Sequence, residues 1–233
     1  MKVSAIVRPL LVLVVLGFGQ SLCQGKTMVN ATFSAKNSFA KLGWKPAGAW
    51  DIFKYKTSKK NPGWVARFPA NPPSDGTLTK KFPVVKNPKQ LTLSVDLGWG
   101  WGAANQGSDA DGFMLVNSQG NGYAFAVHRT QATWAVQWAK VVNYVAPAQW
   151  NWSPRTIDAG IPSVLDGGGL EHVVVTRNAK GHWTFSCKTW NNNAGGKVTF
   201  KSTATNSFSK IILLGWKNFD DEVYNHIVLK VKK

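Results

Sequence analysis

The sequence predicts an all-β protein, a two-sheet antiparallel sandwich or jelly roll. Apolar residues alternate or cluster in short runs, and no amphipathic helix of convincing length is present. Glycine, proline and asparagine separate these runs at short intervals, as turns do between antiparallel strands. Many short strands in a single domain of this length are typical of a sandwich or jelly roll.

The chain begins with an expected secretory signal peptide over residues 1–25, followed by one domain over residues 26–233. Lys2 and Arg8 precede the apolar run LLVLVVLGF, and the small-residue segment SLCQG follows it. The run is too short for an ordinary bilayer span, and no second hydrophobic stretch follows. We therefore expect a secreted, extracellular protein without a membrane span.

The two cysteines support the same interpretation. Cys23 admits a bacterial lipoprotein, but Leu22 stands where a small residue normally precedes the lipidated cysteine. Removal of the leader leaves Cys187 alone, so no internal disulfide can form. The stability of the domain must then come from a sizeable apolar core.

Charge is distributed unevenly along this basic chain. The formal net charge is +17, and lysine outnumbers arginine 23 to 5, which favours diffuse attraction to anionic surfaces. The segment from Gln90 to Val175 is different, with three basic and six acidic residues. It also contains six of the twelve tryptophans, so a ligand surface is expected there.

Nine segments of the chain have the patterning of strands. NSQGNG, NAKG and NNNAGG are short enough to connect hairpins, and the lysine-rich KYKTSKKNPG and TKKF are expected to be solvated loops or edge strands. Within Tyr123–Arg129, the face with Tyr, Phe and Val is expected to pack, and the face with Ala, Ala and His to leave shallow space above it. The expected strands are 90–97, 113–116, 123–129, 134–142, 171–177, 183–189, 197–201, 210–216 and 225–231.

The order of several segments resembles the concanavalin A-like, laminin-G-like jelly-roll superfamily. These segments are GWKPAGAWDI, SDGTLTKKFPVVKNPKQLTLSVDL, DGFMLVNSQGNGYAFAVHR, LEHVVVTRNAKGHWTFSCK and FDDEVYNHIVLKV. The resemblance covers nearly all of the expected mature chain and implies that the last strand lies beside the first. Because this superfamily contains lectins, adhesion modules, glycoside hydrolases and polysaccharide lyases, it implies no single activity.

Paired tryptophans are the first candidate ligand residues. Trp99 and Trp101 stand between glycines, and Trp150 and Trp152 flank Asn151. In an extended segment the two members of each pair project to the same side. Flat indole rings fixed on one side suit the apolar faces of sugar rings. The alternative is that these rings fill the core, although their glycine, asparagine and serine neighbours favour a ligand surface.

Asp109 and Asp111, with Asn105 before them and Gly112 after them, supply hard oxygen ligands on an expected turn. Such a set suits calcium, and several laminin-G-like and legume-lectin-like domains carry structural calcium in loops. The full EF-hand spacing is missing, and Asp-x-Asp-Gly is also an ordinary turn. Calcium is therefore the one cofactor that the sequence leaves open. A second acidic group, residues 220–222, is expected to be a solvated turn.

A catalytic apparatus is harder to find. A glycoside hydrolase needs two facing carboxylates, and the glutamates are Glu171 and Glu222, without a Glu-x-Asp-x-x-Glu strand. His128, Arg129 and Gln137 form only part of a polysaccharide lyase set. The KLGWKPAGAW start resembles 3-keto-disaccharide hydrolase-type domains, but DGFMLVN departs from their strand motif. No catalytic residue is assigned, and a non-enzymatic protein is favoured.

These observations favour a secreted, lectin-like carbohydrate-binding domain. The four paired tryptophans would stack on sugars, Asn105, Asp109 and Asp111 would bind hydroxyls or calcium, and lysines would hold an anionic polysaccharide or glycan nearby. One alternative is a glycan-active enzyme of the same superfamily. A second alternative is a matrix or mineral-associated structural protein. Secretion and the lack of a basic strand interleaved with aromatics argue against a nucleic-acid partner.

Overall fold

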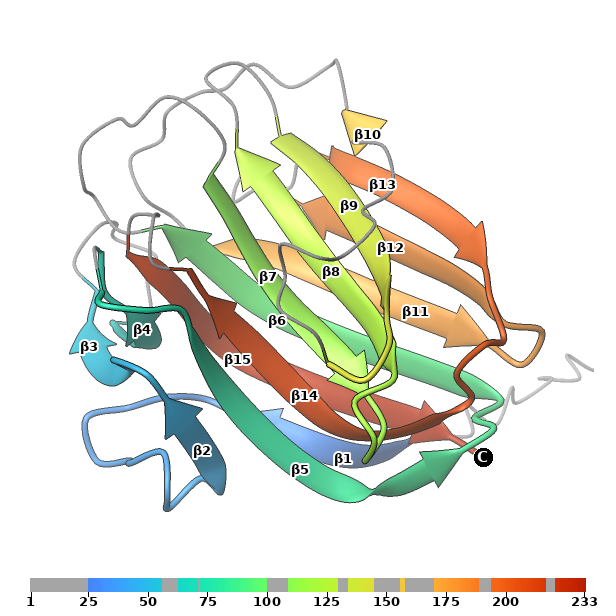
Figure 1. Ribbon diagram of the computed structural model, residues 1–233, viewed down its shortest axis with the longest axis horizontal. Helices are drawn as coiled ribbons and strands as arrows, with labels where there is room; N and C mark the ends of the chain where they lie inside the picture. The colour runs from blue at the N-terminus through green and yellow to red at the C-terminus, as the bar shows by residue number, and fades with distance from the viewer. Residues whose placement is uncertain are drawn as a thin grey trace, which may run out of the picture.

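The protein is a sandwich of two antiparallel sheets (Figure 1), here analysed in a computed structural model. The structure describes residues 25–55, 63–70, 72–99, 109–129, 134–144, 156–157, 170–188, 194–216 and 221–233. The described residues contain no helix that is long and apolar enough to cross a membrane. The two antiparallel sheets confirm the all-β sandwich expected from the sequence.

Sheet A has the strand order β13-β12-β11-β6-β15-β4-β3, and β1 also pairs with β15. Its strands are β1 (Lys26–Ala31), β3 (Asp51–Lys54), β4 (Trp64–Phe68), β6 (Gln90–Trp99), β11 (Glu171–Asn178), β12 (His182–Lys188), β13 (Ala194–Lys201) and β15 (Glu222–Lys232). The pairing of β15 with β1 confirms that the last strand lies beside the first.

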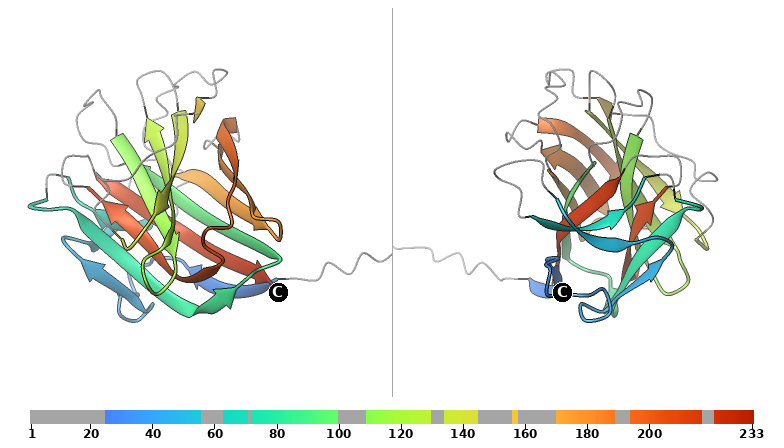
Figure 2. Two further views of the ribbon diagram at one scale, coloured as in Figure 1. Left: turned by 45° about the vertical axis from the view of Figure 1, so that its right-hand side comes forward. Right: turned by 90° about the vertical axis from the view of Figure 1, so that its left-hand side faces the viewer.

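Sheet B has the order β10-β9-β8-β7-β14-β5-β2 and faces sheet A, as the rotated views show (Figure 2). Its strands are β2 (Trp44–Ala47), β5 (Gly76–Lys86), β7 (Asp109–Val116), β8 (Gly122–Arg129), β9 (Trp134–Val141), β10 (Thr156–Ile157) and β14 (Ser207–Gly215). All nine strands predicted from the sequence are present, with ends that differ by a few residues. The three predicted hairpin connections join antiparallel neighbours.

Alternating side chains from the inner faces of both sheets form the main core. In β8, Tyr123, Phe125 and Val127 are fully buried in this core, as the alternation predicts. Aromatic rings connect the layers, since Phe125 of sheet B lies 5.3 Å from Phe185 of sheet A, centroid to centroid. An apolar core of this extent compensates for the missing disulfide. Cys187 is free and buried in it, and burial raises the pKa of its thiol well above the ordinary value.

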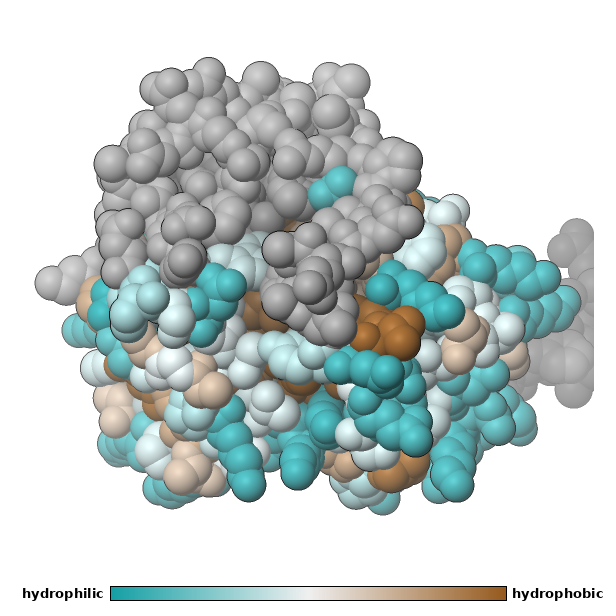
Figure 3. All heavy atoms as spheres, viewed as in Figure 1, coloured by the Kyte–Doolittle hydropathy of each residue, from teal (hydrophilic) through white to brown (hydrophobic). Residues whose placement is uncertain are grey.

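The outer face of sheet B differs from the expectation. Shallow open space was predicted above Ala124 and Ala126, but both side chains are fully buried. Ala124 belongs to a second apolar cluster on this face, together with Met114, Val116 and Ile212. In the same view as Figure 1, hydrophilic residues gather along the lower part of this face, with hydrophobic atoms visible between them (Figure 3).

The lysine-rich segment Thr79–Phe82 is a second correction. It lies inside β5, which pairs with β14 on one side and β2 on the other, so it is neither a loop nor an edge strand. Lys80 is tolerated there because its ammonium group reaches the carbonyl oxygen of Leu42. The other lysine-rich segment, residues 54–63, lies largely outside the described residues.

Candidate functional site

One end of the sandwich, which we call the Trp99 end, brings together the strand ends that border the predicted site. Strand β6 finishes at Trp99, whose Cα partner is Glu222 at the start of β15. In sheet B, Asp109 at the start of β7 pairs with Arg129, which in turn pairs with Trp134. Residues far apart in the sequence are therefore adjacent here.

The structure places only part of the predicted ligand set. The backbone of Trp99 ends β6, and the turn expected around Asp109 and Asp111 is wrong, because both residues lie within β7, opposite Arg129 and Val127. The shared tryptophan surface stays a prediction. Four predicted ligand residues lie outside the described part of the chain: Trp101, Asn105, Trp150 and Trp152.

Glu222 fixes the Trp99 end from inside. Its side chain is fully buried, and its two carboxylate oxygens accept the backbone N–H of Trp216 at 3.1 and 3.0 Å. A buried carboxylate is stable only when hydrogen-bond donors compensate for its lost hydration. The bond therefore joins the end of β14 to the start of β15. The solvated turn expected over residues 220–222 is wrong for Glu222.

Two residues further along β15, the Tyr224 hydroxyl joins the two sheets. It accepts a hydrogen bond from the N–H of Gly112 at 3.1 Å. Its own proton is within donating distance of two carbonyl oxygens, that of Leu214 at 2.8 Å and that of Gly112 at 2.9 Å. The ladder between β7 and β14 ends at Phe113 and Leu213. The hydroxyl thus takes the place of ladder hydrogen bonds one residue beyond that point, and it holds β7 and β14 at a fixed separation.

Trp216 is a candidate ligand residue that the sequence analysis missed. It is half-buried and packs against the apolar cluster on the outer face of sheet B. A Cβ atom on Gly112 would lie 3.2 Å from the Cη2 atom of the Trp216 ring, so the glycine lets the indole approach the backbone. The signal was present in the sequence, because Gly215 precedes this tryptophan as Gly98 precedes Trp99.

An ion-pair cluster supports the same end from sheet A. The Arg67 guanidinium donates to both carboxylate oxygens of Asp51, at 3.0 and 2.6 Å, and approaches Asp221 at 3.4 Å. The hydrogen bond to Asp51 raises the pKa of Arg67. Asp221 also accepts the backbone N–H of Ala70 at 2.7 Å, so the residue before β15 is held in place.

The two glutamates do not form an open catalytic pair. Glu171 and Glu222 both lie at the Trp99 end, on the strands that flank β6, opposite Leu97 and Trp99. Both side chains are buried, with exposed fractions of 5% and 0%. The carboxylate of Glu222 is occupied by the backbone of Trp216. This arrangement suits a structural role, because a glycosidase needs carboxylates that reach the sugar bond.

Two histidines flank a carboxylate on sheet A. His172 Nδ1 lies 2.6 Å from Asp96 Oδ1, and His226 Nδ1 lies 3.2 Å from Asp96 Oδ2. The Nδ1 atoms of the two histidines thus contact different oxygens of the Asp96 carboxylate. Within the described residues, no group of three or more histidine, cysteine, aspartate or glutamate side chains could hold a metal ion.

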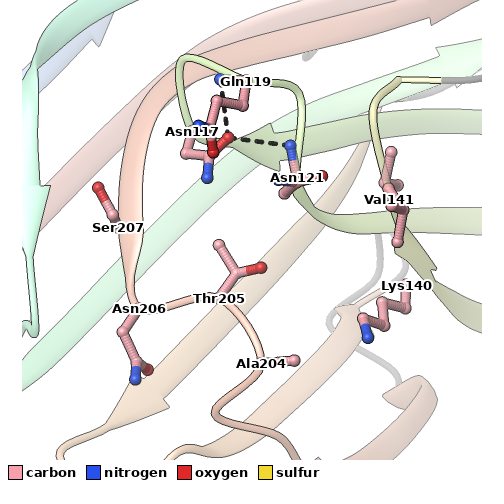
Figure 4. Close-up of a pocket in the computed structure, with 10 residues that line it drawn as sticks. Asn117, Gln119, Asn121, Lys140, Val141, Ala204, Thr205, Asn206 and Ser207 are labelled. Carbon is pink, nitrogen blue, oxygen red and sulfur yellow. Dashed lines mark hydrogen bonds between the residues drawn. The ribbon is translucent and has the colours of Figure 1, made fainter.

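The opposite end of the sandwich, which we call the hairpin end, contains a polar hollow of about 380 Å³ (Figure 4). It lies between the turn 117–121, the end of β9 and the segment 204–207 that leads into β14. Amide and hydroxyl side chains dominate its lining, together with one ammonium group and the exposed side chain of Val142. Nothing in the sequence analysis pointed to this hollow, because the hairpin turns were taken only as connections.

Comparison with known proteins identifies the fold. No protein-family model and no curated protein sequence matches the chain. Solved structures do match: the CBM2 module of Lactobacillus casei BL23 phage J-1 evolved Dit is 11% identical, covers 90% of this chain and 97% of its own, and has a TM-score of 0.60. The chain has the concanavalin A-like fold.

Two further structures share this fold. A carbohydrate esterase from Shiga toxin-encoding bacteriophage phi24B is 12% identical over 90% of this chain and 100% of its own, with a TM-score of 0.58. The VIP36 exoplasmic/lumenal domain, in its Ca²⁺/Man3GlcNAc-bound form, is 10% identical over 87% and 86% of the two chains, with a TM-score of 0.55. At these identities the concanavalin A-like fold is what the chains have in common.

Proposed function

We propose that this protein is an extracellular, non-enzymatic carbohydrate-binding domain whose sugar site lies at the Trp99 end. The observation that carries the proposal is Trp216, a half-buried indole that packs on the outer face of sheet B at this end. Its position is fixed by the Glu222 carboxylate and by the close approach to Gly112. A rigid aromatic ring gives stacking surface to a sugar at low entropic cost.

The predicted tryptophans extend this surface. Trp99 ends β6 at the position opposite Glu222, and Trp101 follows two residues later in the chain. In this proposal Trp150 and Trp152 would add the second pair of rings, and the carboxylates of Asp109 and Asp111, whose backbone starts β7, would bind hydroxyls or calcium. Because single stacking contacts are weak, useful affinity depends on several rings acting together.

The fold supports the proposal in a general way. Among structures that share it, one is a CBM2 module and another was solved with Man3GlcNAc and Ca²⁺ bound. The buried glutamates favour binding over hydrolysis. Lysines at exposed positions, among them Lys45 on the edge strand β2 and Lys197 on the edge strand β13, would concentrate anionic polymers near the protein.

A polysaccharide panel tests the proposal. The purified protein is incubated with insoluble or immobilised neutral, uronate and sulfated polysaccharides, at low and high salt, with calcium or with EDTA. We expect retention on at least one polysaccharide that persists at high salt, because salt screens charge but leaves ring stacking intact. Loss of retention in EDTA would add calcium to the site at Asp109 and Asp111.

Three outcomes count against the proposal. Binding that disappears completely at high salt on every polymer would indicate the charge-driven matrix protein instead. Release of reducing sugar or of unsaturated products from any polymer would indicate the enzyme. Absence of retention across the whole panel would remove the carbohydrate-binding function altogether.

A further inference from the structure

Two asparagines in the lining of the hollow at the hairpin end accept backbone hydrogen bonds through their side-chain oxygens. The Asn117 side-chain oxygen accepts the backbone N–H groups of Gln119 and Asn121, both at 2.9 Å (Figure 4). The Asn121 side-chain oxygen accepts the N–H of Asn143 at 2.8 Å. Because backbone N–H groups only donate, the orientation of both amides is fixed. Asn117 has both oxygen lone pairs in use, and Asn121 has one of its two in use, so the NH₂ groups are the main groups that these side chains can offer to a ligand.

These hydrogen bonds also make one wall of the hollow rigid. Gly120 at the hairpin tip accepts the N–H of Tyr144 through its carbonyl oxygen, at 3.2 Å. With the bond from Asn143 to Asn121, this contact docks the segment after β9 onto the hairpin. A wall held by backbone hydrogen bonds keeps its donors in place before a ligand arrives, which lowers the entropic cost of binding.

The other wall connects to a buried cation. Asn206 lines the hollow, and its side-chain oxygen accepts a hydrogen bond from the guanidinium of Arg177. Arg177 is only 3% exposed, and its guanidinium also donates to the carbonyl oxygens of Pro88 and Asn178. Within the described residues, no carboxylate lies within ion-pair distance of this guanidinium. Among the described residues, the positive charge of Arg177 therefore has no carboxylate partner.

The charge among the described residues that line the hollow is positive. Lys140 contributes an ammonium group from the end of β9, and no aspartate or glutamate is among the described lining residues. Thr205 and Ser207 add hydroxyls on the opposite side (Figure 4). A donor-rich lining beside a buried guanidinium favours a ligand that carries an anionic acceptor.

We propose that this hollow is a second saccharide site, which binds the carboxylate or sulfate of an acidic pyranose through Lys140 and the amide groups of Asn117 and Asn121. The volume of about 380 Å³ is in the range of small-ligand sites and far exceeds a lone inorganic anion. The exposed side chain of Val142 gives the C–H face of a sugar ring an apolar contact. This site lies at the end opposite the tryptophans and does not depend on them.

Two-dimensional NMR titration tests the site with defined probes: methyl glucuronoside, methyl galacturonoside and galactose 6-sulfate, their neutral parent sugars, and sodium sulfate. We expect an acidic sugar to shift the amide signals of residues 117–121, 140–142 and 204–207. The neutral parents should bind about tenfold more weakly, because they lack the charge-assisted hydrogen bonds. The Lys140→Gln variant should lose about tenfold in affinity for the acidic sugar, and Lys140→Arg should keep most of it.

The control variant is Lys230→Gln, which removes the same charge from an exposed position on sheet A. Its affinity should stay within about twofold of the unmodified protein, because exposed distant charges are screened. Equal weakening in both lysine variants would overturn the site in favour of general charge attraction. Equal affinity for sodium sulfate and the acidic sugars would overturn the saccharide assignment. Absence of amide shifts in these segments with every acidic sugar would overturn the proposal. Failure of the site at the Trp99 end is distinguishable, because it would appear as unchanged indole N–H signals of the tryptophans there.

Discussion

Replacing Trp99 and Trp101 together by alanine is expected to weaken retention on the bound polysaccharide by about tenfold or more, with little change in the stability of the fold. Each stacked ring contributes roughly 0.5–1.5 kcal/mol beyond its buried area, and a loss of 1.4 kcal/mol is about tenfold in affinity. Depletion binding or affinity electrophoresis on the polysaccharide chosen from the panel measures the effect. Urea unfolding of the same variant measures its stability.

Phe53→Ala is the matched control. Phe53 is an exposed aromatic residue, 36% accessible, on β3 of sheet A, where it lies under the Arg67 guanidinium. Its loss should leave retention unchanged, which separates a site effect from the general loss of an aromatic ring. If the two indoles fill the core instead, the double variant will lose several kcal/mol of unfolding free energy, about 3–5 for each buried tryptophan. That result would move both residues from the ligand surface into the sandwich.

Tyr224→Phe is expected to lower the unfolding free energy by about 2–3 kcal/mol, because a buried polar group that loses its partner costs about 1–3 kcal/mol. The hydroxyl is completely buried and satisfies Gly112 and Leu214 where the ladder between β7 and β14 has ended. Phenylalanine keeps the ring but leaves these backbone groups without the hydroxyl. Urea denaturation followed by tryptophan fluorescence gives the difference directly.

The comparison variant is Tyr123→Phe. The Tyr123 hydroxyl donates to Ser202 at 2.7 Å and accepts the N–H of Thr205 at 3.4 Å, close to the polar hollow of the hairpin end. The bond to Ser202 is partly exposed, so water can replace the hydroxyl at Ser202, and the bond to Thr205 is buried but long; the loss should therefore be smaller than for Tyr224. Equal losses in the two variants, or a loss below about 0.5 kcal/mol for Tyr224→Phe, would contradict the role of Tyr224 as the inter-sheet bridge.

The strands that the sequence predicted correctly share a simple physical origin. Between Gln90 and Val231, the predicted strands either alternate apolar and polar residues or form short continuous apolar runs, such as FMLV and IILL, and glycine- or asparagine-rich turns separate several of them. Alternation determines which side chains face the core, so the inner face of β8 was also predicted correctly. The N-terminal strands β1 to β5 were missed because their patterns are broken by Pro46, by lysines and by short lengths.

Other failures come from contacts that no local pattern contains. Lys80 and Lys81 indicated a loop or an edge, yet β5 lies between β14 and β2, and Lys80 finds its acceptor in Leu42, 38 residues away. Glu222 belongs to an acidic run that looked solvated, but the backbone of Trp216 compensates for its burial. Ala124 faces a second apolar cluster, and the residues that form it come from four different strands.

The two candidate sites differ in the same way: one could be selected from local sequence, and the other depends on contacts that form only in the folded protein. Glycine-framed tryptophans could be selected from the sequence because glycine next to tryptophan is unusual for a core strand. The polar hollow could not be selected, because it needs the hairpin 117–121, Lys140 and Asn206 to meet in space. Its donor-rich character depends on which amide oxygens the fold consumes, and that is a property of the folded backbone alone.

The most direct measurement for the central proposal is a titration of the tryptophan indole N–H signals with an oligosaccharide of the retained polysaccharide. The twelve indoles are assigned by single substitutions. The proposal predicts large shifts for Trp99, Trp101 and Trp216, and none for the core residues Trp44 and Trp183. Saturation of the protein without any shift of the first three indoles would contradict carbohydrate binding at the Trp99 end.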